Sequence, residues 1–503
     1  MNIKQAKDYI KDCVKIYLKK DEFGEYRIPV VRQRPVFLLG APGIGKTAIM
    51  EQIAQELGIA LVSYSMTHHT RQSALGLPFI CKKEYSGEMT DVSEYTMSEI
   101  IASVHETMEA SGIREGILFL DEINCVSETL APSMLQFLQY KVFGRHRVPE
   151  GWIVVTAGNP PEYNKSVREF DVVTMDRLRL LEVEADYHVW KEYAGEQGVH
   201  SAILNYLDLK KEHFYRIEAG LKGKTYVTAR GWEDLSEILQ MYEEEGMQTD
   251  EALVGQYIRN EKIAKEFTAY YDLYQKYKRD YQIYQILSGH APDSAVIRAQ
   301  QAPFDERLSL VGMLLDKIQS EMREAVETAD YLTELTASLK AVKALLTRDE
   351  GATLEQLLEE QRSRREKKIE SLQKAGALSK GVRKKEKHVL AFLQEEQKFC
   401  MLESGKEESG FVALEKRYRE QVVRMKENTA AIGERLHALF VFLEKAFPEG
   451  NEMLIFVTEL TVNDYSARFI GMFGSEDYRR HNEELLISER KNELQEEIAA
   501  LEL

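Results

Sequence analysis

Apolar residues in the first part of the chain follow two alternating patterns. Short runs in which every residue is apolar, such as Val36–Leu39 and Ile117–Leu120, are separated by stretches whose apolar residues recur at helical spacing, such as Ile49, Ile53 and Leu57. Short apolar runs are typical of buried strands, and recurrence every three or four residues is typical of amphipathic helices. Strands that alternate with helices predict an α/β core built on a parallel sheet.

The pattern changes in the C-terminal part, which has few glycines and prolines and many strong helix formers. Apolar residues recur there at helical spacing, which predicts a long all-α domain. The segment 354–399 predicts two charged helices that turn at Ala375–Gly381, and we expect a projecting helical hairpin. Basic residues gather near its tip: Arg362, Arg364, Arg365, Lys367, Lys368, Lys380, Arg383, Lys384, Lys385 and Lys387.

The basic residues of this hairpin are compatible with more than one role. Glutamates are interleaved with them, and no aromatic residue lies among them to stack on nucleic-acid bases. A solvated helix face, or a docking arm for an acidic protein, is therefore favoured over a surface that binds nucleic acid or a membrane.

Composition narrows the class of protein. The chain has 503 residues, 44% hydrophobic and 30% charged, which is a globular balance and predicts about three domains. No apolar run approaches the ~18 residues of a membrane span, and the N-terminus has the pattern of an amphipathic helix rather than a signal peptide. A formal net charge of -17 disfavours nucleic acid as the main partner. Four scattered cysteines fit a reducing compartment, and we expect a cytoplasmic location.

The stretch "GAPGIGKT" follows the first apolar run and fits the phosphate-loop pattern G-x-x-x-x-G-K-[ST]. Its glycines let backbone N–H groups approach phosphate oxygens, Lys46 brings a positive charge to the β- and γ-phosphates, and the Thr47 hydroxyl is a ligand for Mg²⁺. The N-terminus of the next helix also favours an anion. The predicted ATP-binding residues are Gly40, Ala41, Pro42, Gly43, Ile44, Gly45, Lys46, Thr47 and Ala48.

Polar residues follow two further apolar runs. In "ILFLDEIN", Asp121 is predicted to hold Mg²⁺ and Glu122 to polarise the attacking water, because ligands bind at the carboxyl ends of strands in open α/β sheets. The alternative is a pair of exposed acids that cap the strand or the next helix. Asn159 follows "IVVTAG" and is a candidate to bind the γ-phosphate or the water, although an Asn-Pro turn is the alternative.

Together these motifs resemble those of the AAA+ ATPases, and within them the MoxR branch. The resemblance makes the phosphate loop Walker A, "ILFLDE" Walker B and Asn159 the sensor 1 residue. It implies five parallel strands, for which the candidates are Val36–Leu39, Ala60–Tyr64, Ile117–Leu120, Ile153–Ala157 and Leu180–Glu184. The segment 65–100 resembles the helix-2 insertion of this branch, which faces the ring pore or a partner.

Two arginines are assigned through the same resemblance. Arg177 lies where the family has an arginine finger, which acts on the site of a neighbouring subunit, and Arg179 remains an alternative. A surface arginine paired with Asp176 is the non-functional interpretation. Arg230 occupies the position of sensor 2, although it could be an ordinary residue at a helix N-terminus. A finger that acts in trans implies a head-to-tail ring, and the family implies a hexamer.

These inferences predict three domains: an α/β core at 1–187 that includes the N-terminal helix, an all-α lid at 188–285, and a helical C-terminal domain at 286–503. The predicted function is Mg²⁺-dependent ATP hydrolysis coupled to remodelling or maturation of a protein partner, which the resemblance suggests is a protein with a von Willebrand A (VWA) domain. The rival interpretations are a nucleic-acid-dependent motor and a nucleotide-gated scaffold with negligible turnover.

Overall fold

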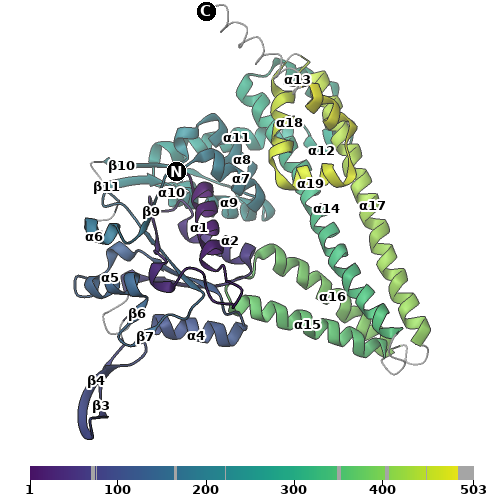
Figure 1. Cartoon of the computed structure of the whole chain (residues 1–503). Helices are drawn as coiled ribbons and strands as arrows, with labels where there is room; N and C mark the ends of the chain where they lie inside the picture. Colours follow the sequence, from purple (N-terminus) through teal and green to yellow (C-terminus); the bar gives the residue numbers. More distant parts are fainter. Residues whose placement is uncertain are drawn as a thin grey trace, which may run out of the picture. The chain divides into compact units, whose positions relative to one another are not determined.

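The structure, a computed structural model, describes residues 1–68, 74, 76–163, 167–220, 223–347, 353–402, 407–448 and 450–484. The chain divides into two units (Figure 1). The first contains 1–189 together with 359–393, and the second contains 190–358 together with 394–503. The domain boundaries predicted at 187 and 285 remain predictions. The first unit also includes a segment, 359–393, that lies far along the chain.

A five-stranded parallel sheet forms the centre of the first unit, as predicted. Its order is β2-β5-β8-β1-β9, so β2 and β9 are the edge strands. The central strand β8 is buried along its whole length, as expected for a parallel sheet with both faces covered. The strands span β1 (Val36–Gly40), β2 (Ala60–Ser65), β5 (Gly116–Asp121), β8 (Trp152–Gly158) and β9 (Arg179–Val183).

Amphipathic helices of the first unit bury one face each. In α1 the buried residues include Ile10 and Val14, and Asn2 caps the helix by accepting a hydrogen bond from the Gln5 amide. The helices are α1 (Ile3–Tyr17), α2 (Lys46–Leu57), α4 (Glu99–Ser111), α5 (Ala131–Tyr140) and the short α6 (Val172–Met175).

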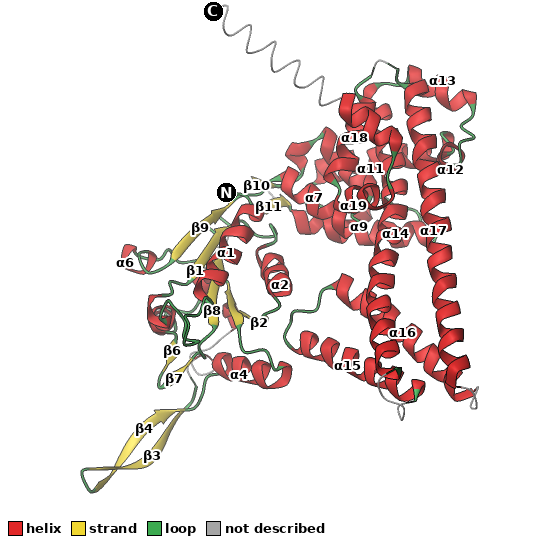
Figure 2. Cartoon of the chain, turned by 45° about the vertical axis from the view of Figure 1, so that its right-hand side comes forward, coloured by secondary structure: helices red, strands yellow, loops and turns green. Residues whose placement is uncertain are grey.

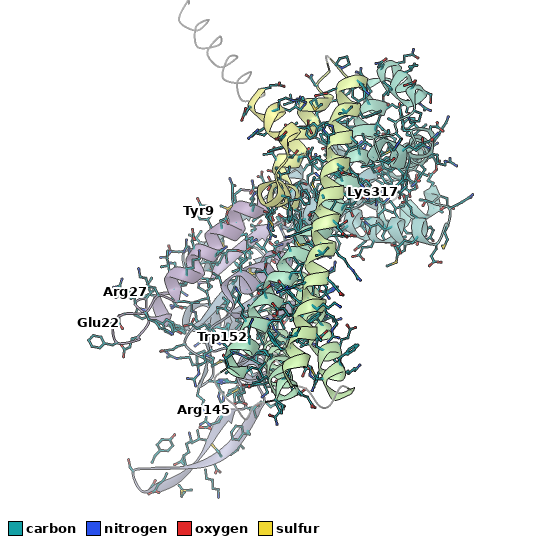
Figure 3. The ribbon with its side chains drawn as sticks, turned by 90° about the vertical axis from the view of Figure 1, so that its right-hand side faces the viewer. Tyr9, Glu22, Arg27, Arg145, Trp152 and Lys317 are labelled. Carbon is teal, nitrogen blue, oxygen red and sulfur yellow. The ribbon has the colours of Figure 1, made fainter. Side chains whose placement is uncertain are left out.

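The predicted insertion contains a two-stranded antiparallel ribbon, β3 (Pro78–Tyr85) and β4 (Glu88–Tyr95) (Figure 2). A second, smaller hairpin, β6 (Val142–Phe143) and β7 (His146–Arg147), contacts its base. Arg145 lies at the base of the ribbon (Figure 3). It is 2.6 Å from Glu94, which also binds Lys83. Residues 69–73 and 75 of the insertion lie outside the described residues.

The helical hairpin of α15 (Leu354–Lys374) and α16 (Lys380–Leu402) is present, but the prediction that it projects freely is wrong. Its tip packs on the edge of the sheet, where the amide of Leu61 in β2 donates to the carbonyl of Ala375 at 2.8 Å. Ala375 and Ala377 are buried with residues of β2 and α4 in one hydrophobic cluster. An edge strand has unpaired backbone groups, and the small tip residues let another backbone approach closely enough to pair with one of them.

Some basic side chains of the hairpin are paired within it. Arg365 and Lys368 both bind the buried carboxylate of Glu386, and Lys374 binds Glu370 at 2.6 Å. These charges are therefore neutralised inside the hairpin. The tip of the hairpin belongs to the core, so the hairpin does not project as the predicted docking arm for an acidic protein would.

The second unit is mainly helical, and α14 is its longest helix. It packs against α8, α11, α17, α18 and α19. The helices are α7 (Tyr187–Gln197), which begins in the first unit, α8 (Ser201–Leu209), α9 (Ala229–Glu244), α10 (Glu251–Tyr257), α11 (Glu261–Asp280), α12 (Ile283–Leu287), α13 (Asp293–Gln301), α14 (Phe304–Leu346), α17 (Glu407–Ala446), α18 (Glu452–Val462) and α19 (Asp464–Phe473).

One feature of the segment 188–285 differs from the all-α prediction. Strands β10 (Arg216–Gly220) and β11 (Gly223–Val227) pair antiparallel in the middle of it. Apolar and polar residues alternate in "RIEAG", which is the period of a strand rather than of a helix. Among the described residues, no helix combines the length and the apolar character needed to cross a membrane.

Candidate active site

The predicted phosphate loop connects the last residue of β1 to the first turn of α2. Lys46 is the first residue of α2, and its Nζ donates to the carbonyl oxygens of Gly40 and Ala41 at 2.7 and 2.8 Å. It also donates to Oδ1 of Asn159 at 2.8 Å. The loop residues Pro42–Gly45 thus lie between a strand end and a helix N-terminus, which is an arrangement that favours anions.

Thr47 and Asp121 come together beside this loop. The Thr47 hydroxyl donates to Oδ2 of Asp121 at 3.2 Å, so two oxygen ligands converge from α2 and the end of β5. Mg²⁺ prefers oxygen ligands and takes few of them from protein, the rest coming from water and phosphate. Among the described residues, no group of three or more His, Cys, Asp or Glu side chains could hold a metal ion. The Thr47–Asp121 pair offers the oxygen ligands that Mg²⁺ bound together with a phosphate would need.

Glu122 has an unusual backbone and two hydroxyl partners. Its φ of +56° lies in the left-handed region, which is strained for a residue with a side chain. Its carboxylate accepts hydrogen bonds from Ser65 at 2.9 Å and from Thr67 at 3.1 Å. These hydroxyls were not identified from the sequence. The feature of the sequence that could have indicated them is the polar end of β2, where Ser65 pairs in register with Asp121.

Asn159 follows β8, which is the neighbour of β1 in the sheet, and this adjacency brings its amide to Lys46. The backbone of Asn159 is held as well, because Nδ2 of Asn124 donates to its carbonyl oxygen at 2.8 Å. Asn124 belongs to the short 3-10 helix Ile123–Cys125 after Glu122 and was not identified from the sequence.

Arg177 and Arg179 lie at the other end of the sheet. Arg179 pairs with Val36 at the start of β1, and Gly40 is four residues further along, or about 13 Å. The guanidinium of Arg179 donates to Sγ of Cys13 at 3.1 Å in the same chain. Arg177 is exposed in the turn after α6. The structure therefore does not bring either arginine to Lys46 of its own chain.

Arg230 is the second residue of α9, whose N-cap Thr228 accepts a hydrogen bond from Gly231. It is exposed and belongs to the second unit, so its role at the phosphate site stays a prediction. All four cysteines are among the described residues and are free thiols.

Comparison with known proteins agrees with this geometry. Residues 36–171 match the family model described as "ATPase family associated with various cellular activities (AAA)". The match runs from the start of β1, through β5 and β8, to the N-cap of α6. No curated protein matched the chain. Residues 36–171 therefore form an AAA domain, and its family supports an ATPase activity for this chain.

Proposed function

We propose that the chain is an Mg²⁺-dependent ATPase of the AAA+ type that assembles into a ring and uses hydrolysis to remodel a protein partner. One observation carries the hydrolytic part of this proposal. The Lys46–Asn159 and Thr47–Asp121 pairs, at 2.8 and 3.2 Å, bring together a cation, an amide and two metal ligands at the carboxyl ends of the central strands.

Each residue of this cluster has a separate task. Lys46 binds the β- and γ-phosphates, and Asn159 orients the γ-phosphate or the attacking water. Glu122 polarises that water after its carboxylate leaves Ser65 and Thr67. Mg²⁺, held by Thr47 and Asp121, would neutralise charge on the phosphates.

The position of Arg177 supports the proposal that copies of the chain assemble into a ring. An exposed arginine remote from its own phosphate loop is suited to complete the site of a neighbouring copy, and such a finger contributes ~10³–10⁵ in rate in comparable enzymes. Exposed Val172 and Val173 lie beside it and suit a contact between copies. A hexamer, membership of the MoxR branch and a VWA-domain partner follow from the family resemblance alone, as does the partner-facing role of the β3–β4 ribbon.

Steady-state ATP turnover tests the hydrolytic proposal. We expect Glu122→Gln to bind ATP but not to turn it over, and Lys46→Ala to lose affinity for ATP. Specific activity should rise with protein concentration as copies assemble. Equal inactivity of the wild type and Glu122→Gln at every concentration would favour the nucleotide-gated scaffold. Stimulation of turnover by DNA or RNA would favour the nucleic-acid motor.

Mixing inactive variants tests the finger. Arg177→Ala and Glu122→Gln should each be inactive alone, but together they form some interfaces with an intact glutamate on one copy and an intact arginine on the other. Random mixing should restore roughly a quarter of wild-type turnover. Arg179→Ala is the matched control and should stay active, because its guanidinium is engaged with Cys13. No recovery on mixing would contradict a finger that acts in trans.

A further inference from the structure

Asn124 is a buried polar residue with a specific target. It is 4% exposed, and its side chain reaches from the 3-10 helix after Glu122 to the end of β8, where Nδ2 donates to the carbonyl oxygen of Asn159 at 2.8 Å. One side chain thus joins the segment that carries Glu122 to the segment that carries Asn159.

Gly158 provides the space for this contact. A Cβ on Gly158 would lie 2.5 Å from Oδ1 of Asn124, which is closer than real Cβ contacts come. The φ of Gly158 is not in the left-handed region, so the close approach of Asn124, and not the backbone conformation, requires glycine at this position. Asn124 and Gly158 therefore form one packing unit directly before Asn159.

The amide of Asn124 is only half satisfied. Its Oδ1 is buried and has no hydrogen-bond partner among the described residues. A buried acceptor without a partner destabilises a fold, and an apolar residue of similar shape avoids this penalty. An asparagine at this position is thus poorly explained by stability alone, whereas its donor has a well-defined acceptor.

The need for this donor arises when Lys46 changes partners. The Lys46 ammonium has three hydrogens, and its bonds to Gly40, Ala41 and Asn159 use all three. To bind a triphosphate, Lys46 must give up some of these acceptors. When Asn159 is the acceptor given up, its side chain loses the bond that orients it, and its direction then depends on how firmly its backbone is held.

We propose that Asn124 is a positioning residue that fixes the backbone of Asn159, so that the Asn159 amide stays directed at the γ-phosphate or the attacking water while Lys46 is engaged with phosphate. This inference rests on the proposed ATPase function. Asn124 touches neither substrate nor metal. It also links the site to the segment before α6 through its own carbonyl, which accepts from the Arg168 amide at 2.9 Å, a bond that side-chain variants leave in place.

Two substitutions separate donor chemistry from shape. Asn124→Asp keeps the shape but replaces the donor with a carboxylate that repels the Asn159 carbonyl, and Asn124→Ala removes the amide. We expect kcat for ATP to fall at least about ten-fold in both, with KM within about three-fold of wild type, since the lost interaction matters for hydrolysis and not for ground-state binding. Binding of a fluorescent ATP analogue checks that each variant still folds its nucleotide site.

A double-mutant cycle with Asn159→Ala gives the decisive readout. If Asn124 acts only through Asn159, the Asn124→Ala/Asn159→Ala double variant should turn over no more slowly than Asn159→Ala alone. Gly158→Ala offers a second route, because it displaces the Asn124 side chain without changing its chemistry and should lower kcat in the same way. Multiplicative losses in the cycle, or an increase in KM at unchanged kcat, would overturn the inference.

Asn205 is the matched control. It is also a buried asparagine with an unpartnered amide atom, and it also packs against a glycine, Gly312, but it belongs to the second unit. Asn205→Ala should change thermal stability without changing kcat. Full activity of the Asn124 variants in an active wild-type background would refute the positioning role and leave the ATPase proposal standing, whereas a wild type without turnover would refute both.

Discussion

Two hairpins of the first unit have opposite environments, because the β3–β4 ribbon is exposed and the tip of the α15–α16 hairpin packs on the sheet. The β3–β4 ribbon exposes large apolar residues, with Ile80 76% and Met89 65% exposed. The α15–α16 hairpin has a small-residue tip, yet Ala375 is 0% and Ala377 5% exposed. The large apolar side chains of the ribbon are therefore exposed, whereas the small side chains at the tip of the helical hairpin are buried.

The difference shows that apolar character alone does not decide which tip is buried. The edge of the sheet offers an amide, that of Leu61, and only a tip without bulky side chains lets a carbonyl reach it. The apolar residues of the ribbon have no such complementary surface within the described part of the first unit. Exposed apolar residues on a projecting element are typical of an interaction site.

The largest expected effect is a difference in folding stability between variants of two glutamates, Glu386 and Glu94, each of which binds two basic residues. Glu386 binds Arg365 and Lys368 in the docked hairpin and is almost fully buried, whereas Glu94 joins Lys83 of the ribbon to Arg145 of the β6–β7 hairpin. Glu386→Ala removes the carboxylate that compensates Arg365 and Lys368, whose side chains are 12% and 59% exposed, so it should destabilise the first unit by less than the about 3–5 kcal/mol of a fully buried pair. Glu94→Ala should have a much smaller effect.

Denaturant unfolding followed by Trp152 fluorescence measures this difference. Trp152 is the only tryptophan of the first unit, since Trp190 and Trp232 belong to the second, and replacing those two by Phe isolates the signal. Equal losses of stability for the two glutamate variants would contradict the conclusion that the helical hairpin belongs to the core and the ribbon does not.

The next effect compares two turn glycines. Gly376 and Gly87 have φ of +67° and +89°, so alanine is strained at both by about 1–2 kcal/mol. A Cβ on Gly376 would also lie 3.0 Å from the Leu61 carbonyl, whereas a Cβ on Gly87 meets nothing within 4 Å. Gly376→Ala should therefore be the more destabilising, and only it should increase hydrogen exchange in β2. Faster exchange in β2 of Gly87→Ala would contradict this assignment.

A smaller effect is expected from serine substitutions in the two hairpins. Ala375→Ser places a hydroxyl in a buried environment and should cost about 1–3 kcal/mol if that hydroxyl finds no partner. Ile80→Ser combined with Met89→Ser changes exposed side chains and should stay within about 0.5 kcal/mol of wild type in thermal unfolding. Loss of folding in the ribbon variant would show that the ribbon packs against the core.

The smallest effect depends on pH. A hydrogen bond from Lys83 holds the pKa of Glu94 below its usual value of 4.5, and Arg145 lowers this pKa further. A carboxylate with a lowered pKa stabilises the folded ribbon above pH 4.5, and this contribution is lost as the pH falls through the lowered value. Amide protection at the ribbon base, corrected for intrinsic exchange, should decrease in acid in the wild type. Glu94→Gln should show no such decrease.

The sequence predicted those parts of the fold and the site that depend on local pattern. Buried runs such as Ile117–Leu120 gave the strands, and the Gly-rich loop located Lys46 and Thr47. Ser65, Thr67 and Asn124 were missed, because their importance comes from strand register and from contacts between segments distant in the chain. The docked tip was missed for a similar reason, since an Ala-Gly-Ala turn has the same local pattern whether it is free or packed.

The docked tip also affects how the protein folds during synthesis. The first unit is discontinuous, because its edge strand β2 pairs with Ala375, which is made long after Val189. At 5–20 residues per second, a ribosome needs roughly 10–40 s to travel from one to the other. Throughout that interval the nascent nucleotide-binding core exposes a bare strand edge, so a chaperone that shields such edges should associate with the chain before its hairpin emerges.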